Sequence, residues 1–137
     1  MTAIPTPIDE YLQTDFIAFD GERECSIRIG EQSAEFDALL LRYEVTGGVF
    51  ITGWNPFSQL LHAWVNQHAN ARMAAHFVER GVPALPHVGR STDGIWFEEG
   101  FFALGLTEKD GLAIATSFDQ HAIVVVTFGG MAELQLT

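Results

Sequence analysis

The stretch that decides the fold is VFITGWNPFSQLLHAWVNQHANARMAAHFVERG, from Val49 to Gly81. It begins with the β-branched and aromatic residues of a buried strand, which Pro56 must end because proline has no N–H for a sheet ladder. Apolar residues then recur at helical spacing and predict the longest helix of the chain, with Asn55 as its N-cap and Pro56 at its first position. The pattern also allows a break near His62, with a short turn before the main helix. Gly81 is predicted to end the helix in the left-handed conformation.

Outside this stretch, hairpin patterns stand beside strand–helix units. Residues 82–94 are rich in proline, glycine and small polar residues and predict a loop long enough to act as a flap, while Gly100 predicts a bulge in a strand. The whole pattern predicts an α+β fold: a mixed, mostly antiparallel sheet with about three to four helices packed on it. We expect a flexible tail over residues 1–8 and a single domain over residues 9–137. Further strands are predicted at 16–19 and 25–29, with a turn signal at Asp20-Gly21 between them, at 95–104 as one long strand or a bent pair, and at 122–128 and 132–136. Further helices are predicted at 8–13, at 33–43 with Ser33 as its cap, and at 107–118 with the T-x-x-D start of Thr107 and Asp110.

The charge of the chain restricts its partners. The net charge is −11 and Lys109 is the only lysine. It divides into −7 over residues 1–44, +2 over residues 45–92 and −6 over residues 93–137. Such a chain lacks the basic surface that binds DNA or RNA through phosphates. The central segment alone is mildly favourable to an anion, although an acidic shell also serves solubility.

Several features predict a cytoplasmic protein. No apolar run approaches the roughly 20 residues that cross a bilayer, so we expect no membrane partner. The first residues, MTAIPTPIDE, have neither the basic start nor the apolar core of a signal peptide. Cys25 has no second cysteine to pair with, which fits a reducing compartment.

The sequence contains none of the common catalytic or cofactor motifs, so it predicts no cofactor and leaves open whether the protein is an enzyme. His68, Arg72 and His76 follow one another on one helix face, but a cation between two histidines argues against a metal ion. A solvated helix face is the preferred interpretation, and no metal site is predicted. Cys25 lies on the apolar side of a strand, where a thiol stays protonated and is a poor nucleophile.

Polar side chains near large aromatic rings form the predicted site. Glu98 shares a strand face with Trp96, so its carboxyl is the candidate general acid or base, in an apolar setting that raises its pKa. Arg28 is predicted to contact an acidic group of a ligand. Strand alternation makes Glu99 the solvent-facing neighbour of Glu98. The alternatives are that Asn55 and Ser58 only cap a helix and that one of the pair Glu98 and Glu99 simply points to solvent. The predicted ligand-binding residues are Arg28, Trp54, Asn55, Ser58, Asn66, Trp96 and Gln120.

Several motifs resemble, in the right order, a bacterial family of single-domain proteins of unknown function, family 3293 of that series. They are RIG at residues 28–30, ITGWNPFS at 51–58, Asn66, Gly81, IWFEEGFFALG at 95–105 and FDQHA at 118–122. The resemblance covers nearly the whole chain and implies no known activity. This chain departs from the family pattern at Gly53 for Ala, Val65 for Glu, Gly100 for Ser, and Asp119 and His121 for Gly and Asn. The change at Gly53 is mild, and the others remove or alter polar groups close to the predicted pocket.

Two classes of function follow from these observations. The leading hypothesis is a pocket for a small, planar, polar ligand such as a nucleotide or nucleoside, since indole rings stack and amides recognise base edges. The alternative is an acidic interaction module that neutralises a basic toxin or nuclease, as an immunity protein does. In a third interpretation the Trp and Asn side chains only hold the fold together. The sequence leaves the oligomeric state open.

Overall fold

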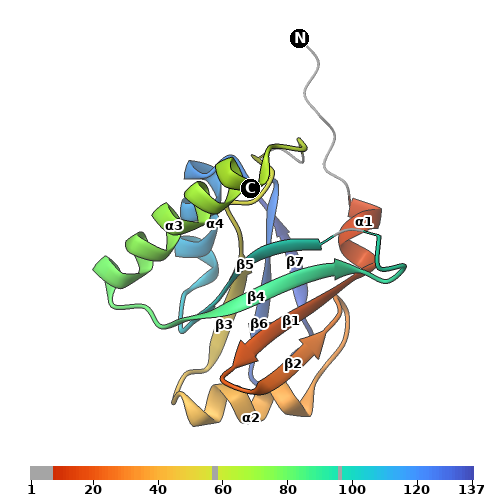
Figure 1. Ribbon diagram of the computed structural model, residues 1–137. Coiled ribbons are helices and arrows are strands. Elements are labelled where there is room, and N and C mark those ends of the chain that lie inside the picture. The colour runs from red at the N-terminus through yellow and green to blue at the C-terminus, as the bar shows by residue number, and fades with distance from the viewer. Residues whose placement is uncertain (1–7, 57–58, 96) are drawn as a thin grey trace.

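The computed structural model describes residues 8–56, 59–95 and 97–137, in which one or two strands follow each helix (Figure 1). The helices are α1 (Ile8–Leu12), α2 (Ala34–Arg42), α3 (Ala63–Arg80) and α4 (Glu108–Ser117). The strands are β1 (Thr14–Asp20), β2 (Arg23–Ile27), β3 (Gly47–Ile51), β4 (Ala84–Ser91), β5 (Phe97–Leu104), β6 (Ala122–Thr127) and β7 (Glu133–Leu136).

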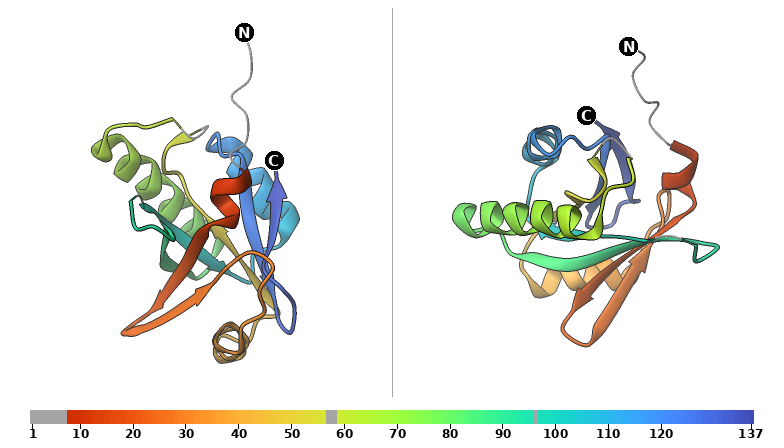
Figure 2. Two further views of the ribbon diagram at one scale, coloured as in Figure 1. Left: turned by 90° about the vertical axis from the view of Figure 1, so that its right-hand side faces the viewer. Right: turned by 45° about the horizontal axis from the view of Figure 1, so that its top comes forward.

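All the described strands join one sheet in the order β2-β1-β4-β5-β3-β6-β7. Every described pairing is antiparallel, so the α+β prediction is confirmed, with a sheet that is antiparallel throughout rather than mixed. The β1–β2 hairpin turns through Gly21 and Glu22, directly after Asp20, so the predicted hairpin is confirmed, and Gly21 has a φ of 62°. Figure 2 shows that the sheet is strongly curled, as twisted antiparallel sheets are.

Helices cover both faces of the sheet. α2 packs on one face through Phe36, Leu39 and Leu40, whose neighbours include Phe50 and Phe102 from the middle of the sheet. The other face is covered by α3 and α4, which bury a second apolar cluster. Ser33 and Thr107 cap α2 and α4 through hydrogen bonds that their hydroxyl oxygens accept from backbone N–H groups, as predicted for α2 and for the T-x-x-D start of α4.

The long helix begins later than the Asn55 cap predicts. α3 starts at Ala63 after His62, so the alternative with a break near His62 is confirmed and the cap at Asn55 is wrong. Asn55 has a φ of 47°, a left-handed conformation that asparagine adopts more readily than most residues, whereas N-cap residues typically lie in the β region. The helix ends as predicted, at Gly81 with a φ of 67°. Residues 52–56 and 59–62, the described part of the connection from β3 to α3, lie in neither an α-helix nor a strand and form the irregular segment between them.

Two further predictions around β4 and β5 are wrong. Residues 84–91 form a strand instead of a loop, and Pro86 is tolerated because β1 pairs with β4 only from His87 onward. Gly100 lies in an unbroken register opposite His87 and makes no bulge. A Cβ atom at Gly100 would lie 2.6 Å from the carbonyl oxygen of Ile51, so the glycine permits close backbone approach.

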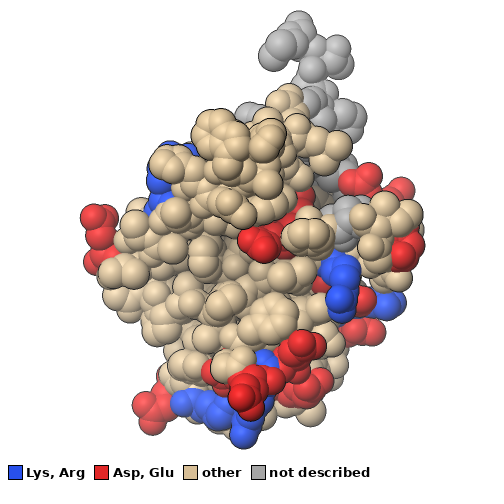
Figure 3. All heavy atoms as spheres, in the orientation of Figure 1, with Lys and Arg blue, Asp and Glu red and all other residues tan. Residues whose placement is uncertain are grey.

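Charged side chains gather mainly along the lower and right-hand margins of the face in Figure 3, and an acidic group also lies near its centre. In the described part of the chain, ion pairs join Arg28 to Asp15, Arg42 to Asp20 and Arg80 to Asp110. No helix in the described part of the chain is both long and apolar enough to cross a membrane.

Candidate functional site

A cavity of about 590 Å³ opens at one end of the sheet. It lies between α1, the start of β5 and the irregular segment that joins β3 to α3, and Figure 1 shows α1 and that segment at the same end of the sheet. Four predicted site residues, Trp54, Asn55, Asn66 and Glu98, line it together. The described lining residues are Glu10, Tyr11, Trp54, Asn55, Leu60, Leu61, Ala63, Asn66, Ile95, Phe97 and Glu98.

Three buried side-chain amides hold the turn that carries Trp54 and Asn55. Asn70 Oδ1 accepts from the Gly53 N–H at 2.8 Å, and Asn66 Oδ1 accepts from the Asn55 N–H at 2.8 Å. Between them, Gln120 Nε2 donates to the Trp54 carbonyl oxygen at 3.2 Å. Because each amide meets a backbone group that would otherwise be buried without a partner, the three side chains fix consecutive residues of the turn.

Asn55 connects this turn to Glu98. Its Oδ1 already accepts from Asn66 Nδ2 at 2.8 Å and from the Leu61 N–H at 3.1 Å, so its amide hydrogens are the groups that bond the Glu98 carboxyl. Burial raises the pKa of Glu98 to about 7, while the Asn55 hydrogen bond lowers it and the charge of Glu10 raises it. A carboxyl with this pKa exchanges a proton near neutral pH, which suits acid–base chemistry.

The sequence analysis missed Glu10 and Tyr11, which α1 places in the cavity wall. Burial, with the negative charges of Glu98 and Glu10, raises the pKa of the Tyr11 hydroxyl, which therefore stays protonated and can donate a hydrogen bond. Nothing in the sequence IDEYL indicates that this short helix faces a strand about ninety residues further along the chain.

Exposed apolar side chains surround the polar groups of the cavity. Leu60 is 91% exposed and Ile95 is 82% exposed. Phe97, which directly precedes Glu98 in the sequence, is also exposed. Trp54, in contrast, is buried. The cavity therefore combines a polar floor with an apolar rim, the usual composition of a small-molecule site.

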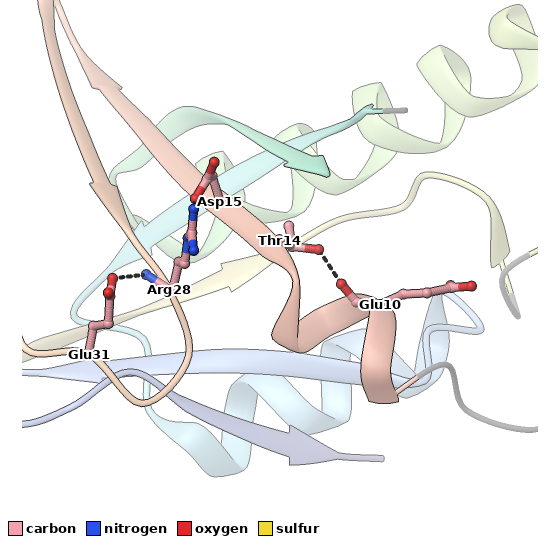
Figure 4. Close-up of polar contacts among 5 residues, drawn as sticks. All are labelled: Glu10, Thr14, Asp15, Arg28 and Glu31. Atoms are coloured by element: carbon pink, nitrogen blue, oxygen red, sulfur yellow. Dashed lines mark hydrogen bonds and ion pairs between the residues drawn. The ribbon is translucent and has the colours of Figure 1, made fainter. Parts of the chain in front are cut away.

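The other predicted site residues lie elsewhere. Arg28 directly follows β2, and its Nε donates to Asp15 Oδ1 at 2.6 Å. It is not among the described residues that line the cavity. Figure 4 shows the Arg28 side chain pointing toward Asp15, apart from Glu10 of the cavity wall. Gln120 is buried behind Trp54. Ser58 and Trp96 fall outside the described residues.

The remaining candidates for chemistry do not gather at the cavity. Cys25 is buried, as predicted, and burial raises the pKa of its thiol. His68 and Arg72 are exposed on α3, and the Arg72 guanidinium lies 5.3 Å from the centre of the Phe118 ring. Across residues 8–56, 59–95 and 97–137, no three His, Cys, Asp or Glu side chains are grouped so that they could hold a metal ion.

Comparison with protein families gives one match, to the family described as Protein of unknown function (DUF3293), over residues 51–123. No curated protein and no solved structure matches the chain. The matched segment contains every described cavity residue except Glu10 and Tyr11, together with Asn70 and Gln120 behind the turn. Because these 73 residues are more than half of the 137-residue chain, the protein belongs to this family of unknown function.

Proposed function

We propose that the cavity binds a small, planar, uncharged polar molecule of the nucleobase or nucleoside class. The observation that carries the proposal is the convergence of Trp54, Asn55 and Glu98 on one cavity, whose 590 Å³ lies in the usual range for ligand sites. The apolar rim supplies surface for the faces of a ring, and the Asn55 and Glu98 side chains supply hydrogen bonds for its edge.

The charge of the cavity favours an unphosphorylated ligand. Glu10 and Glu98 are its charged groups, and no Lys or Arg stands among its described lining residues. Phosphate groups are bound by arginine, lysine or backbone N–H groups, and Arg28 is occupied by Asp15. The nucleoside member of the predicted ligand class is therefore preferred to the nucleotide, and the predicted contact from Arg28 remains a separate prediction.

Glu98 is the group that we assign to any reaction at this site. Protonated, its carboxyl donates a hydrogen bond, and ionised, it accepts one or takes a proton from the ligand. Asn66 and Gln120 are assigned positioning roles, because their amides bond Asn55 and the backbone of Trp54. Ser58 and Trp96 keep their predicted roles as ligand contacts.

A binding screen with paired ligands tests the proposal. Thermal shift followed by calorimetry compares nucleobases and nucleosides with their monophosphates, on wild type, Asn55→Ala and Glu98→Gln. The nucleoside should raise the Tm of wild type, its monophosphate should bind at least about tenfold more weakly, and both variants should lose about tenfold in affinity, which is about 1.4 kcal/mol. Gln67→Ala is the matched control, since Gln67 is exposed on α3 and does not line the cavity.

The screen has outcomes that contradict the proposal. Absence of binding by any nucleobase or nucleoside would contradict the proposal. Equal binding by wild type and the two cavity variants would show that the ligand does not bind in this cavity. Tighter binding of the monophosphates would contradict the charge argument while leaving the location of the site intact.

The charge distribution favours a second proposal, an interaction module for a basic protein. Residues 1–44 carry −7 and residues 93–137 carry −6, which suits steering toward a cationic partner. A gene for a basic toxin or nuclease directly upstream would identify the partner to test. A one-to-one complex with the purified product of that gene supports this proposal, and failure of the two purified proteins to associate at low salt contradicts it.

A further inference from the structure

His87 is a fully buried titratable group that the proposed site does not use. The side chain is 5% exposed, and neither Nδ1 nor Nε2 has a hydrogen-bond partner among the described residues. The imidazole stacks on Phe16 with ring centres 5.8 Å apart and lies 4.7 Å from the ring of Phe50. Since buried polar groups are nearly always hydrogen-bonded, two unpartnered nitrogens on one side chain need an explanation.

The register of β4 and β5 places His87 next to Glu98. His87 lies opposite Gly100, and Gly89 lies opposite Glu98, so His87 and Glu98 are diagonal neighbours on one face of the sheet. Both directly opposed positions are glycines and fill no space between the two side chains. Cβ atoms of diagonal neighbours are typically about 7 Å apart, a gap that two hydrogen bonds through one water molecule can span.

A cavity of about 30 Å³ occupies this position. His87, Gly89 and Glu98 line it, and Glu98 and Tyr11 also line the larger cavity. One water molecule needs about 10–15 Å³ of such volume and two or more polar partners. The small cavity has the volume for a water, and it has polar groups from His87, Glu98, Thr14, Thr52 and Tyr11 along its wall.

We propose that an ordered water molecule in this small cavity bridges the imidazole of His87 and the carboxyl of Glu98, which makes His87 a positioning residue of the site. The water accepts the imidazole N–H and donates to the carboxylate when Glu98 is ionised. When Glu98 is protonated, its hydroxyl donates to the water, which donates to the basic imidazole nitrogen. The ring nitrogen that faces the water carries the proton in the first arrangement and is unprotonated in the second, so the neutral imidazole meets the two arrangements as its two tautomers.

The surroundings fix the charge state of the two partners. Tyr11 and Glu98 are the titratable groups that face His87 among the described lining residues, and Glu98 also faces Glu10. Burial lowers the pKa of His87 to about 3, so the imidazole is neutral at pH 7. A bond from water to a carboxylate is stronger than one to a neutral acid, and the bridge therefore favours the ionised form of Glu98. This inference does not depend on the identity of a ligand.

The test combines a high-resolution crystal structure of the wild type with titration of the Glu98 carboxyl by ¹³C NMR in variants. We expect a water within about 2.6–3.2 Å of a His87 ring nitrogen and of a Glu98 oxygen. His87→Phe removes both hydrogen-bonding groups and should raise the pKa of Glu98 by about 0.5 or more. His87→Gln keeps a donor and an acceptor and should leave that pKa within about 0.3 of wild type. His76→Phe, at a partly buried histidine of α3 outside both cavities, is the matched control.

Two results would overturn the proposal. One is a crystal structure in which no water contacts both side chains. The other is a Glu98 carboxyl that titrates identically in the Phe and Gln variants, which is what a purely structural role of the ring predicts. If His87→Gln does not fold, the wild-type crystal structure decides the question without it.

Discussion

Asn66 holds Asn55 through two hydrogen bonds from one amide. Its Oδ1 accepts from the Asn55 backbone N–H and its Nδ2 donates to the Asn55 side-chain oxygen, each at 2.8 Å. These two hydrogen bonds give the backbone N–H of Asn55, whose φ is 47°, a partner and fix the direction of the Asn55 side chain. The remaining hydrogens of Asn55 then face Glu98, so a residue of α3 orients the polar floor of the cavity.

Replacing Asn66 should destabilise the fold as well as the site. Asn66→Ala leaves the Asn55 N–H and Oδ1 without their buried partner, and we expect a loss of about 2–4 kcal/mol in the free energy of unfolding. Urea denaturation measures the loss. Gln67→Ala, one residue further on the exposed side of the helix, should change stability by less than about 0.5 kcal/mol. Similar values for the two variants would show that the Asn55–Asn66 pair carries little energy.

Glu98→Gln should change how stability depends on pH. The pKa of Glu98 rises from 4.5 in the unfolded chain to about 7 in the folded protein, so between these values the folded state binds more protons and stability falls as pH rises. The glutamine does not titrate and still accepts a hydrogen bond from Asn55. Its gain in stability over wild type should therefore grow between pH 4.5 and 7, to about 1–3 kcal/mol. Denaturation curves at several pH values give the difference, and a gain that is independent of pH would be inconsistent with a raised pKa.

His87→Phe should have the opposite pH dependence. Burial lowers the pKa of His87 from 6.5 to about 3, so between these values the unfolded chain binds more protons and wild-type stability is lost as pH falls. The phenylalanine cannot take a proton, and its advantage over wild type should increase from pH 6.5 downward. Thermal melts of both proteins between pH 4 and 8 test this expectation. Parallel curves would mean that the imidazole is accessible to solvent.

Gly100 should tolerate no side chain. In Gly100→Ala the new Cβ would lie 2.6 Å from the Ile51 carbonyl oxygen and 2.8 Å from Thr52 Cβ, and the backbone oxygen cannot move without breaking the β3–β5 ladder. We expect a loss of about 2–4 kcal/mol in unfolding free energy, measured by urea denaturation. Gly89→Ala is the control on the neighbouring strand, because its nearest contact would be an ordinary 3.4 Å to Thr14. Equal losses at the two glycines would refute the close-approach argument.

Local sequence patterns predicted most of the fold, and contacts between distant strands account for what they missed. Helix ends are predicted from single residues: the hydroxyl groups of Ser33 and Thr107 cap N-termini, and Gly81 adopts the left-handed conformation of a C-cap. The structure confirms all three. Strand β4 was missed because proline and glycine, here Pro86 and Gly89, normally interrupt strands. Here Gly89 faces Glu98 and Gly100 faces His87, a requirement that only the register of β4 against β5 reveals.

The candidate site was predicted in part for the same reason. Trp54, Asn55 and Glu98 stand in recognisable motifs, and strand alternation correctly separated Glu98, which lines the cavity, from the exposed Glu99. The sequence around Tyr11 and His87 does not indicate that they belong to the site, because only the curled sheet brings them to Glu98. The amides of Asn66 and Gln120, which are predicted to contact the ligand, bond the backbone of the turn or a side chain on it, and Asn66 also lines the cavity.

The central claim is that Asn55 and a Glu98 carboxyl with a raised pKa meet on the cavity floor. It is tested most directly by a ¹³C NMR titration of the Glu98 carboxyl in the ligand-free wild-type protein and in Asn55→Ala. A carboxyl buried on the cavity floor and bonded by Asn55 should titrate with a pKa of about 7, and loss of the Asn55 amide should raise this pKa further. A pKa near 4.5 in both proteins would place the carboxyl in open solvent and contradict the account.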